Sequence, residues 1–576
     1  GDRPSSRSNY GINYPYRFPG TKENDRIPTV SVNGFSVLDG GPYPAISSGP
    51  MYTLANNFTW ISGRHTLKFG GNIEHAQQNN FDQIIIGNVP GGTNNQNGRF
   101  EFLDSGNPQS TGLAVANAAL GVFNSYGEIG QRAYTLLRSH AFEGFFQDTW
   151  RVNQKLTLEL GLRYSWYQPW FAVWNDIANF DAQAYDPARR TTVDRVTGAV
   201  TGGDPYNGIV LPGTGFPDSA RGRIPAELVP DVNRLFSNQP RSLINDSQGA
   251  FAPRVGVAYR VAKGTVIRTG FGAFYHRTLF LSSSLFGNPP HQLTQGVTNG
   301  SVDAPGGATR RAFPFQVRAL DRVYAYPTAY TYSFSIQRQL PLSVLLDLAY
   351  VGKNSINLRR SRNLNQLPVG TVQRNPGVNP DALRPFHGLG LIDWAEHTGR
   401  ANYHSFQLSA DRRFSNGFGF GLSYTWSKNI DNTATPWDAY NTQATRGLSS
   451  LDRPHLLNLN FIYELPLFRS NRYLGGWQVS GVIFYRAGNP LSVLDATDTA
   501  GVGPGSGAQP WNVTGSTEVT GERGINLPWF NRAAFSRPAA GTFGNAGVSL
   551  LRGPSFQNWD AALFKNFRLT ERFNAQ

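Results

Sequence analysis

The residues that could carry out chemistry are few and scattered along the chain. Its 576 residues contain nine His, and the closest group that combines His with acids is Glu396, His397 and His404, whose spacing is not typical of a metal site. Asp393 and Glu396 could form a carboxylate pair, although acids in a loop are usually solvated. No nucleophile elbow or Walker-type loop occurs. We therefore expect no enzyme, no metal site and no cofactor.

A second set of polar residues is more informative, because its members fall on predicted strands, on the face opposite the apolar side chains. Charged groups in the middle of a membrane strand are tolerated only in a wet or paired interior. Two interpretations stay open: these groups pair with one another across an internal lumen and hold whatever fills it, or they line the path of a solute. The lumen-facing candidates are Glu159, Arg163, Arg254, Arg268 and Asp347.

The strands that would position these groups alternate strictly between two faces. Between residues 157 and 167 one face is Leu, Leu, Leu, Tyr and Trp, and between 417 and 427 it is Phe, Phe, Leu, Tyr and Trp. A tilted strand of about 9–11 residues crosses a bilayer. Both apolar faces end in amphipathic rings on the side of the long loops, which predicts an interfacial aromatic girdle. The girdle candidates are Tyr164, Trp166, Tyr424 and Trp426.

Tight hairpins alternate with long polar segments along the chain. The predicted hairpins are near 56–75, 140–167, 251–276, 330–351, 403–427 and 455–486, and a further strand is near 559–567. The segments between them are rich in Gly, Pro, Asn and Asp, and we expect loops near 76–139, 168–250, 277–329, 352–402, 428–454 and 487–557. Short turns at one rim and long loops at the other are typical of an outer-membrane β-barrel. The sequence predicts an all-β, antiparallel transmembrane barrel with about 13–14 strands, short periplasmic turns and long extracellular loops.

Composition agrees with this class. No run of 18 apolar residues is present, so a helical membrane span is not expected. The absence of Cys excludes disulfides and thiolate zinc sites. The formal net charge is +14, and 45 of the 52 basic residues are Arg, but these are spread along the whole chain and not gathered on one element. We therefore expect no nucleic-acid partner. We expect most of the Arg side chains to be ion-paired or solvated, and contacts between Arg and phosphorylated surface lipid are the less favoured interpretation.

Several strand segments resemble the TonB-dependent receptor family, and within it the large Oar-like subgroup. These segments are FFQDTWRVNQKLTLELGLRY (145–164), WISGRHTLKFGG (60–71), SYTWSK (423–428), DRPH (452–455) and LFKNF (563–567). The resemblance covers most of the chain, at the strands and not in the loops. It implies a 22-stranded barrel with an internal plug and an N-terminal carboxypeptidase-regulatory-like domain. It also implies energy delivered through a TonB-type protein.

The sequence departs from the full family pattern. No plug, TonB box or regulatory-like domain is visible, the last strands are absent, and the single Met is Met51. We therefore expect residues 1–576 to be a partial barrel domain, a fragment of a longer protein in the bacterial cell outer membrane. Its expected partners are a TonB-type energy-coupling protein, reached through the missing N-terminal part, outer-membrane lipid and lipopolysaccharide, and an unknown solute.

The favoured function is active uptake of a scarce or large solute, such as a siderophore, a cobalamin-like complex, an oligosaccharide or a peptide. The first alternative is an Oar-like surface adhesion or secretion-support barrel, which the loop lengths also suit. The second alternative is a soluble secreted carbohydrate-binding β-protein. Alternation alone does not exclude a soluble sandwich, but a sandwich core has no reason to end strand after strand in Tyr or Trp.

Overall fold

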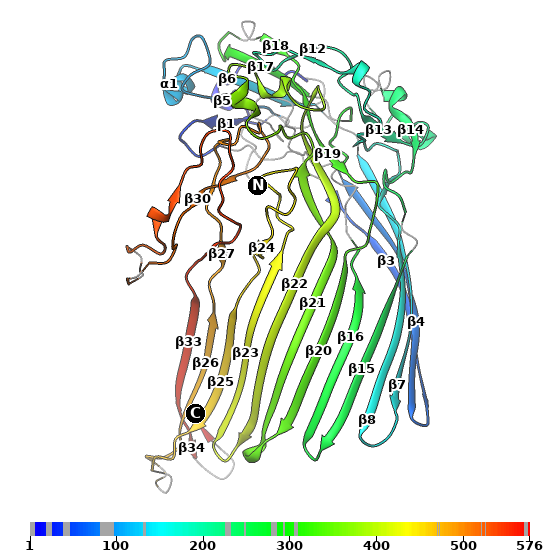
Figure 1. Ribbon diagram of the computed structural model, residues 1–576, viewed down its shortest axis with the longest axis vertical. Coiled ribbons are helices and arrows are strands. Elements are labelled where there is room, and N and C mark those ends of the chain that lie inside the picture. The colour runs from blue at the N-terminus through cyan, green and yellow to red at the C-terminus, as the bar shows by residue number, and fades with distance from the viewer. Residues whose placement is uncertain are drawn as a thin grey trace.

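A computed structural model of the chain is shown in Figure 1. Long strands run side by side through the lower part of the molecule, and shorter elements gather above them. None of the helices in the described part of the chain is long and apolar enough to cross a membrane. The structure describes residues 6–18, 26–38, 47–80, 97–130, 134–224, 232–246, 249–277, 285–291, 294–304, 309–468, 471, 473–519, 521–522, 524, 526–568 and 574–575.

One large sheet dominates the fold. It holds 17 of the described strands. Four of these are short and add to the side of a longer strand, which leaves thirteen long strands; the four are β2 (Ser47–Ser48), β9 (Phe171–Ala172), β19 (Phe315–Leu320) and β24 (Gly447–Leu448). Each long strand pairs antiparallel with the next one along the chain. In order they are β3 (Met51–Ser62), β4 (His65–Asn80), β7 (Thr135–Arg151), β8 (Leu156–Tyr167), β15 (Ala250–Ala262), β16 (Thr265–Tyr275), β20 (Thr328–Gln339), β21 (Val344–Asn363), β22 (Leu389–Ser415), β23 (Phe418–Asp431), β25 (His455–Glu464), β26 (Trp477–Arg486) and β33 (Phe556–Lys565).

The predicted up-and-down antiparallel architecture is therefore confirmed, including all six hairpins and the final strand. Five of the six turns at the lower rim are short because their residues suit tight hairpins, whereas the connection between β25 and β26 runs from Leu465 to Gly476. Between β22 and β23 the two loop residues are Asn416 and Gly417, with φ of 51° and 78°. A two-residue hairpin loop of this kind requires positive φ at both positions, and Asn-Gly is the pair that adopts it most readily.

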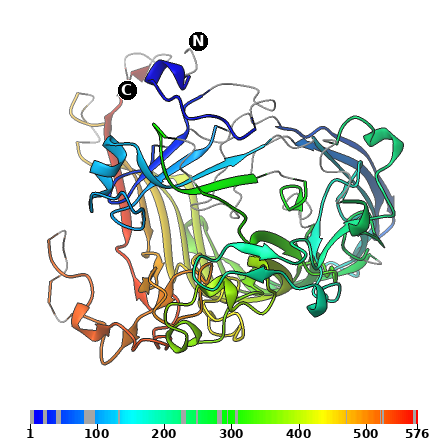
Figure 2. The same ribbon diagram turned by 90° about the horizontal axis from the view of Figure 1, so that it is seen from above.

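The sheet is curved and open. Seen from above, its strands follow an arc (Figure 2). Within the described residues, β3 pairs only with β4 among the long strands, and β33 pairs only with β26. The sheet therefore has two edges and forms part of a barrel wall, in agreement with the partial barrel that the sequence predicts.

The long segments above the sheet are not plain loops, and here the prediction is wrong in detail. Together with the part of the chain before the first hairpin, they form a separate five-stranded sheet and small helices, with buried cores of their own (Figure 1). The aromatic core of the small sheet includes Tyr14, Phe100 and Tyr126. Short strands of two to eight residues carry too little periodicity to be recognised in a Gly- and Asn-rich segment. The five strands are β1 (Thr29–Val32), β5 (Arg99–Phe102), β6 (Val122–Ile129), β17 (Thr294–Ser301) and β18 (Thr309–Arg311).

The β21–β22 hairpin also extends far beyond its predicted end. Pairing continues up to Asn363 and Asp393, inside the segment 352–402 that was predicted as a loop. On its other edge this upper part of β22 pairs in parallel with β19 (Phe315–Leu320). Because protein covers both sides of this extension, its side chains do not show the apolar–polar alternation of a strand in lipid, and the sequence pattern misses it.

Candidate functional site

Contacts across the sheet identify its concave face. Arg277 follows β16, yet its guanidinium forms an ion pair with Glu74 of β4, although β7, β8 and β15 lie between those strands. The same Arg277 donates to the hydroxyl of Ser139 on β7 at 2.6 Å. Groups on strands so far apart can meet only across the hollow of a curved sheet. Glu74 and the residues in register with it therefore face the concave side.

All five predicted polar candidates share this concave face. Glu74 pairs in register with Ala141 on β7, and alternation from there places Glu159 and Arg163 of β8 on the same side. Arg254, Arg268 and Asp347 follow through the register of β15, β16, β20 and β21. The convex face carries the apolar set, for example Leu160 and Val255, which oppose each other.

Three of the five candidates meet in one hollow. Glu159, Arg254 and Arg268 line a depression of about 650 Å³ on the concave wall. The wall is recessed there because four residues of its lining have no side chain: Gly161, Gly256, Gly270 and Gly272. The structure brings neither Arg163 nor Asp347 into this hollow.

The candidates interact with neighbours that the sequence analysis did not single out. Gln147 donates to Glu159 at 3.1 Å, and Arg268 donates to Gln337 at 2.8 Å. Arg163 forms an ion pair with Glu143 at 2.6 Å. These partners could have been found, because they lie on the polar face of strands that the alternation predicts.

The first interpretation of the charged set required its members to pair with one another. Among the residues that the structure describes, no hydrogen bond or ion pair joins any two of Glu159, Arg163, Arg254, Arg268 and Asp347. Arg254 instead lies over the ring of Phe274, with 4.8 Å from its guanidinium carbon to the ring centroid. In this wall four of the five charged groups, all except Asp347, therefore contact residues of neighbouring strands.

A second hollow of about 600 Å³ lies further along the same wall, between β22 and β33. Asp411 and Asp560 line it, together with Asn460 and two glycines, Gly419 and Gly421. The sequence analysis did not identify this site, because its residues come from strands that are distant in sequence. The wall therefore offers one hollow with two Arg and one Glu and another with two Asp and two Arg, Arg412 and Arg413.

The four girdle candidates lie on the convex face. Tyr164 pairs in register with Phe251, and Trp166 with Phe142, on neighbouring strands. Trp426 is 59% exposed in the isolated chain. At the opposite rim, Asp148 interrupts the apolar pattern, and its carboxylate contacts His65 Nδ1 at 2.7 Å beside the short turn. This contact explains a carboxylate on that face.

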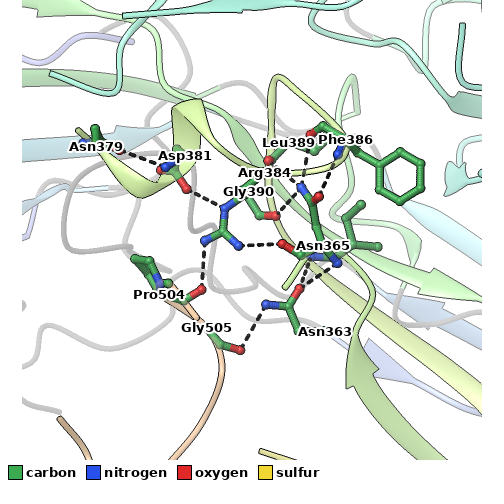
Figure 3. Close-up of polar contacts among 12 residues, drawn as sticks. Asn363, Asn365, Asn379, Asp381, Arg384, Phe386, Leu389, Gly390, Pro504 and Gly505 are labelled. Carbon is green, nitrogen blue, oxygen red and sulfur yellow. Dashed lines mark hydrogen bonds and ion pairs between the residues drawn. The ribbon is translucent and has the colours of Figure 1, made fainter. Parts of the chain in front are cut away.

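Above the wall, a buried arginine joins two of the long segments (Figure 3). Arg384 is only 2% exposed. Its Nε donates to Asp381 Oδ1 at 2.6 Å, and its terminal nitrogens donate to the carbonyl oxygens of Asn365 at 2.9 Å and Pro504 at 2.8 Å. The segments 352–402 and 487–557 are thus bonded together, although Arg384 and Pro504 are 120 residues apart in sequence.

Further hydrogen bonds hold the same junction. The amide of Asn365 donates to the carbonyl oxygens of Leu389 and Gly390, at 2.8 and 3.0 Å. Backbone bonds from Leu367 to Val502 and from Gly370 to Ala500 add to it. We call the elements that lie above the sheet the loop cap. The cap has buried cores and hydrogen-bonded junctions between its segments, so it presents a defined surface.

The acids and histidines that the sequence placed close together are separated in the structure. Glu396 is 8% exposed and accepts from Arg360 at 2.8 Å and Arg362 at 3.3 Å, so the expectation of a solvated loop acid is wrong for this residue. Burial works to raise the pKa of Glu396, but Arg362 and the hydrogen bonds from Arg360 and Thr398 outweigh it and hold the pKa below its usual value.

His397 is buried, and this burial lowers its pKa to about 4, so the imidazole is neutral at pH 7. In the described residues, no three His, Cys, Asp or Glu side chains gather in a group that could hold a metal ion. The site is thus a concave wall with polar hollows, below the loop cap.

An antiparallel meander with an apolar convex face, a polar concave face and aromatic rings toward the long loops defines the class of membrane β-barrels. The family model described as an outer membrane beta barrel domain matches residues 2–576. The chain belongs to this family, and its location is the bacterial outer membrane. The second alternative, a soluble secreted protein, is therefore wrong.

No curated protein matches the sequence. Solved structures with a similar fold include the outer membrane transporter YddB from Escherichia coli, with 9% identity, 91% of this chain and 49% of that chain covered, and a TM-score of 0.44. Another is the siderophore receptor PiuA from Acinetobacter baumannii, with 10% identity, 92% and 51% covered, and a TM-score of 0.41. The chain thus spans about half the length of these proteins.

Proposed function

We propose that this chain is the barrel part of a TonB-dependent-type receptor, of the Oar-like subgroup, that actively takes up a scarce or large solute. The solute classes are a siderophore, a cobalamin-like complex, an oligosaccharide or a peptide. The observation that carries the proposal is the combination of a polar, hollowed concave wall with an ordered cap above it. A cap with buried polar junctions such as Arg384 offers fixed contacts to a solute before it reaches the wall.

In this mechanism the cap binds the solute from outside, and the wall then lets it pass. Binding pockets generally combine shape with a few convergent polar groups. The hollow with Glu159, Arg254 and Arg268 supplies such groups at mid-wall, and its glycines leave room beside them. Energy would come from a TonB-type protein through a part of the receptor outside this chain, and an internal plug would rearrange to open the path.

The alternative is an Oar-like surface adhesion or secretion-support barrel. The extent of the cap favours it, because a layer with its own apolar cores suits contact with a surface or a partner as well as with a solute. The two functions differ in what happens below the cap. Uptake needs the charged groups of the wall, and adhesion does not.

Uptake can be tested in cells with and without the full-length protein. Labelled ferric siderophores, cobalamin, oligosaccharides and peptides are supplied one at a time, with and without a protonophore. We expect one class to accumulate only in cells that carry the protein, and accumulation to stop when the protonophore removes the energy source. Accumulation that persists with the protonophore would indicate a passive pore. No accumulation of any class, together with reduced cell attachment when the protein is deleted, would favour adhesion.

The role of the wall can be tested with matched arginine variants. Arg254→Gln and Arg268→Gln remove cations that line the hollow, whereas Arg260→Gln changes an arginine of β15 that does not line it. We expect the first two variants to reduce uptake while the protein still folds, and the third to leave uptake unchanged. Equal uptake by all three variants would contradict a solute path along this hollow.

A further inference from the structure

A pocket of about 560 Å³ lies on the convex side of the sheet, where β21, β22 and β23 rise toward the loop cap. We call it the convex pocket. It is separate from the concave wall, since Tyr350, Phe406 and Trp426 belong to the apolar face. In a barrel within the outer membrane this face meets lipid and not the solute path. Besides these rings, the residues that line it and carry the argument are His404, Lys428 and Leu448.

The floor of the convex pocket is aromatic and accessible. Tyr350, Phe406 and Trp426 lie in one cross-strand row, and they are 42%, 41% and 59% exposed. The hydroxyl of Tyr350 shares a hydrogen bond of 2.7 Å with His404 Nδ1, and their rings are stacked with centroids 6.2 Å apart. This contact orients the imidazole. Aromatic rings at this level are the usual companions of lipid where the acyl region meets the headgroups.

The row directly above the rings is cationic. Lys428 pairs in register with His404, one step closer to the loops than Phe406 and Trp426. Lys428 is exposed, and in the described part of the chain its ammonium has no hydrogen-bond or ion-pair partner. A lysine at a membrane interface extends its stem over apolar surface and keeps its charge at headgroup level. An unpaired cation above an apolar floor is therefore complementary to a ligand with an anionic head and apolar chains.

The other charges near the pocket do not cancel this cation. Asp452 also lines it, but the Asp452 side chain is 1% exposed and is engaged by Arg552 at 2.7 Å. One row higher, Arg446 is exposed and donates only a long hydrogen bond, 3.5 Å, to Asn402. From the row of Ala410 and Leu422 toward the loops, the convex face of β22 and β23 thus changes from aliphatic to aromatic to cationic.

We propose that the convex pocket binds a phosphorylated, acylated lipid of the outer leaflet. The phosphate accepts hydrogen bonds from the Lys428 ammonium, the cation of Arg446 lies one row above, and an acyl chain lies along Phe406 and Trp426. Hydrogen bonds between charged groups are the strong ones, and phosphate is a preferred partner of lysine. The proposal depends on the membrane location and not on the uptake function, so either can fail without the other.

The test measures lipid retained by the full-length protein. The protein is purified in detergent, and bound lipid A with both phosphates is quantified by native mass spectrometry. Lys428→Gln removes the cation, and Lys353→Gln is the matched control, because Lys353 lies at nearly the same height on β21 but on the concave face. Loss of one charged hydrogen bond predicts roughly tenfold weaker retention for the first variant and no change for the control.

Two comparisons separate the possible sources of binding. Chemically dephosphorylated lipid A should be retained roughly tenfold less than the phosphorylated form by the unaltered protein, a result that does not depend on how the variants fold. Inorganic phosphate should not displace the lipid, because it lacks the acyl chains that contact the rings. Equal retention of the two lipid forms, equal effects of the two lysine variants, or displacement by inorganic phosphate would overturn the proposal.

Discussion

Replacing Leu162 with arginine tests the assignment of the two faces most directly. The convex residues of β8 run from Leu158 to Trp166, and Leu162 is the middle one. Leu162 is four positions from each end of this row. At a rise of about 3.3 Å per residue and a tilt of about 45°, the row extends roughly 9 Å along the membrane normal on each side of Leu162. Leu162 therefore lies close to the bilayer midplane. It is 47% exposed in the isolated chain, beside Phe146 on the next strand.

The expected cost follows from that depth. An arginine on the lipid face near the midplane of a transmembrane barrel destabilises the folded state by about 2–4 kcal/mol. Leu160→Arg should cost less, since Leu160 is paired in register with Asp148, whose carboxylate can meet a new guanidinium. Gln147→Arg is the matched control on the concave face, because Gln147 is in register with Gly161 and already donates to Glu159.

The free energy of unfolding of the full-length protein and of the three variants is measured in lipid vesicles across a denaturant series. We expect the order Leu162→Arg, Leu160→Arg, Gln147→Arg, from the largest loss to almost none. A larger loss for Gln147→Arg than for Leu162→Arg would mean that the faces are reversed. Equal losses for all three would mean that β7 and β8 do not lie between lipid and a wet interior.

Three further predictions concern the loop cap and its side of the membrane. A protease added to intact cells should cut within 168–250 or 487–557 and leave Val152–Lys155 and Ala262–Gly264 uncut; cleavage confined to those turns would refute the topology. Arg384→Met should increase proteolytic cutting within 487–557 severalfold, because it frees that segment from 352–402, while a heat-modifiable folded band persists on a gel. Arg374→Met, at an exposed arginine, is the control, and equal protection of the segment in both variants would contradict a role of Arg384 in joining the two segments. Because the pKa of Glu396 is lowered in the folded cap, its stabilising contribution is complete above about pH 4.5 and is lost as the pH falls through the folded value; hydrogen exchange at 389–400 should therefore accelerate in acid, and a Glu396→Gln variant should not show this acceleration.

A feature of the fold could be predicted from the sequence when the interactions that produce it join residues close together along the chain. Strand alternation and turn chemistry act within a few residues, so they are legible in the sequence. Asn416 and Gly417 define a hairpin by their own backbone preferences, and the rows from Leu158 to Trp166 define a face by period two. The extension of β21 and β22 up to Asn363 and Asp393 escaped prediction, because protein covers it on both sides and the alternation disappears.

The site divides in the same way. Glu159, Arg254 and Arg268 were assigned to the polar face because each sits at an odd spacing from its apolar neighbours, but that they share a hollow depends on register between separate strands. The sequence contains Arg384 and Pro504 at a distance of 120 residues, and nothing local predicts that one donates to the other.

The sequence by itself determined the class of protein, the order of the strands and the face of each side chain, because period-two patterning and hairpin residues are properties of short stretches of chain. Only the tertiary structure decided which polar groups are buried in partnership, as with Glu396 and Arg360, and which are left open toward a ligand, as with Lys428 above its aromatic row. Those outcomes depend on which distant segments pack together and on the free-energy cost of burying an unpaired charge. Neither can be predicted from the residues of one segment alone.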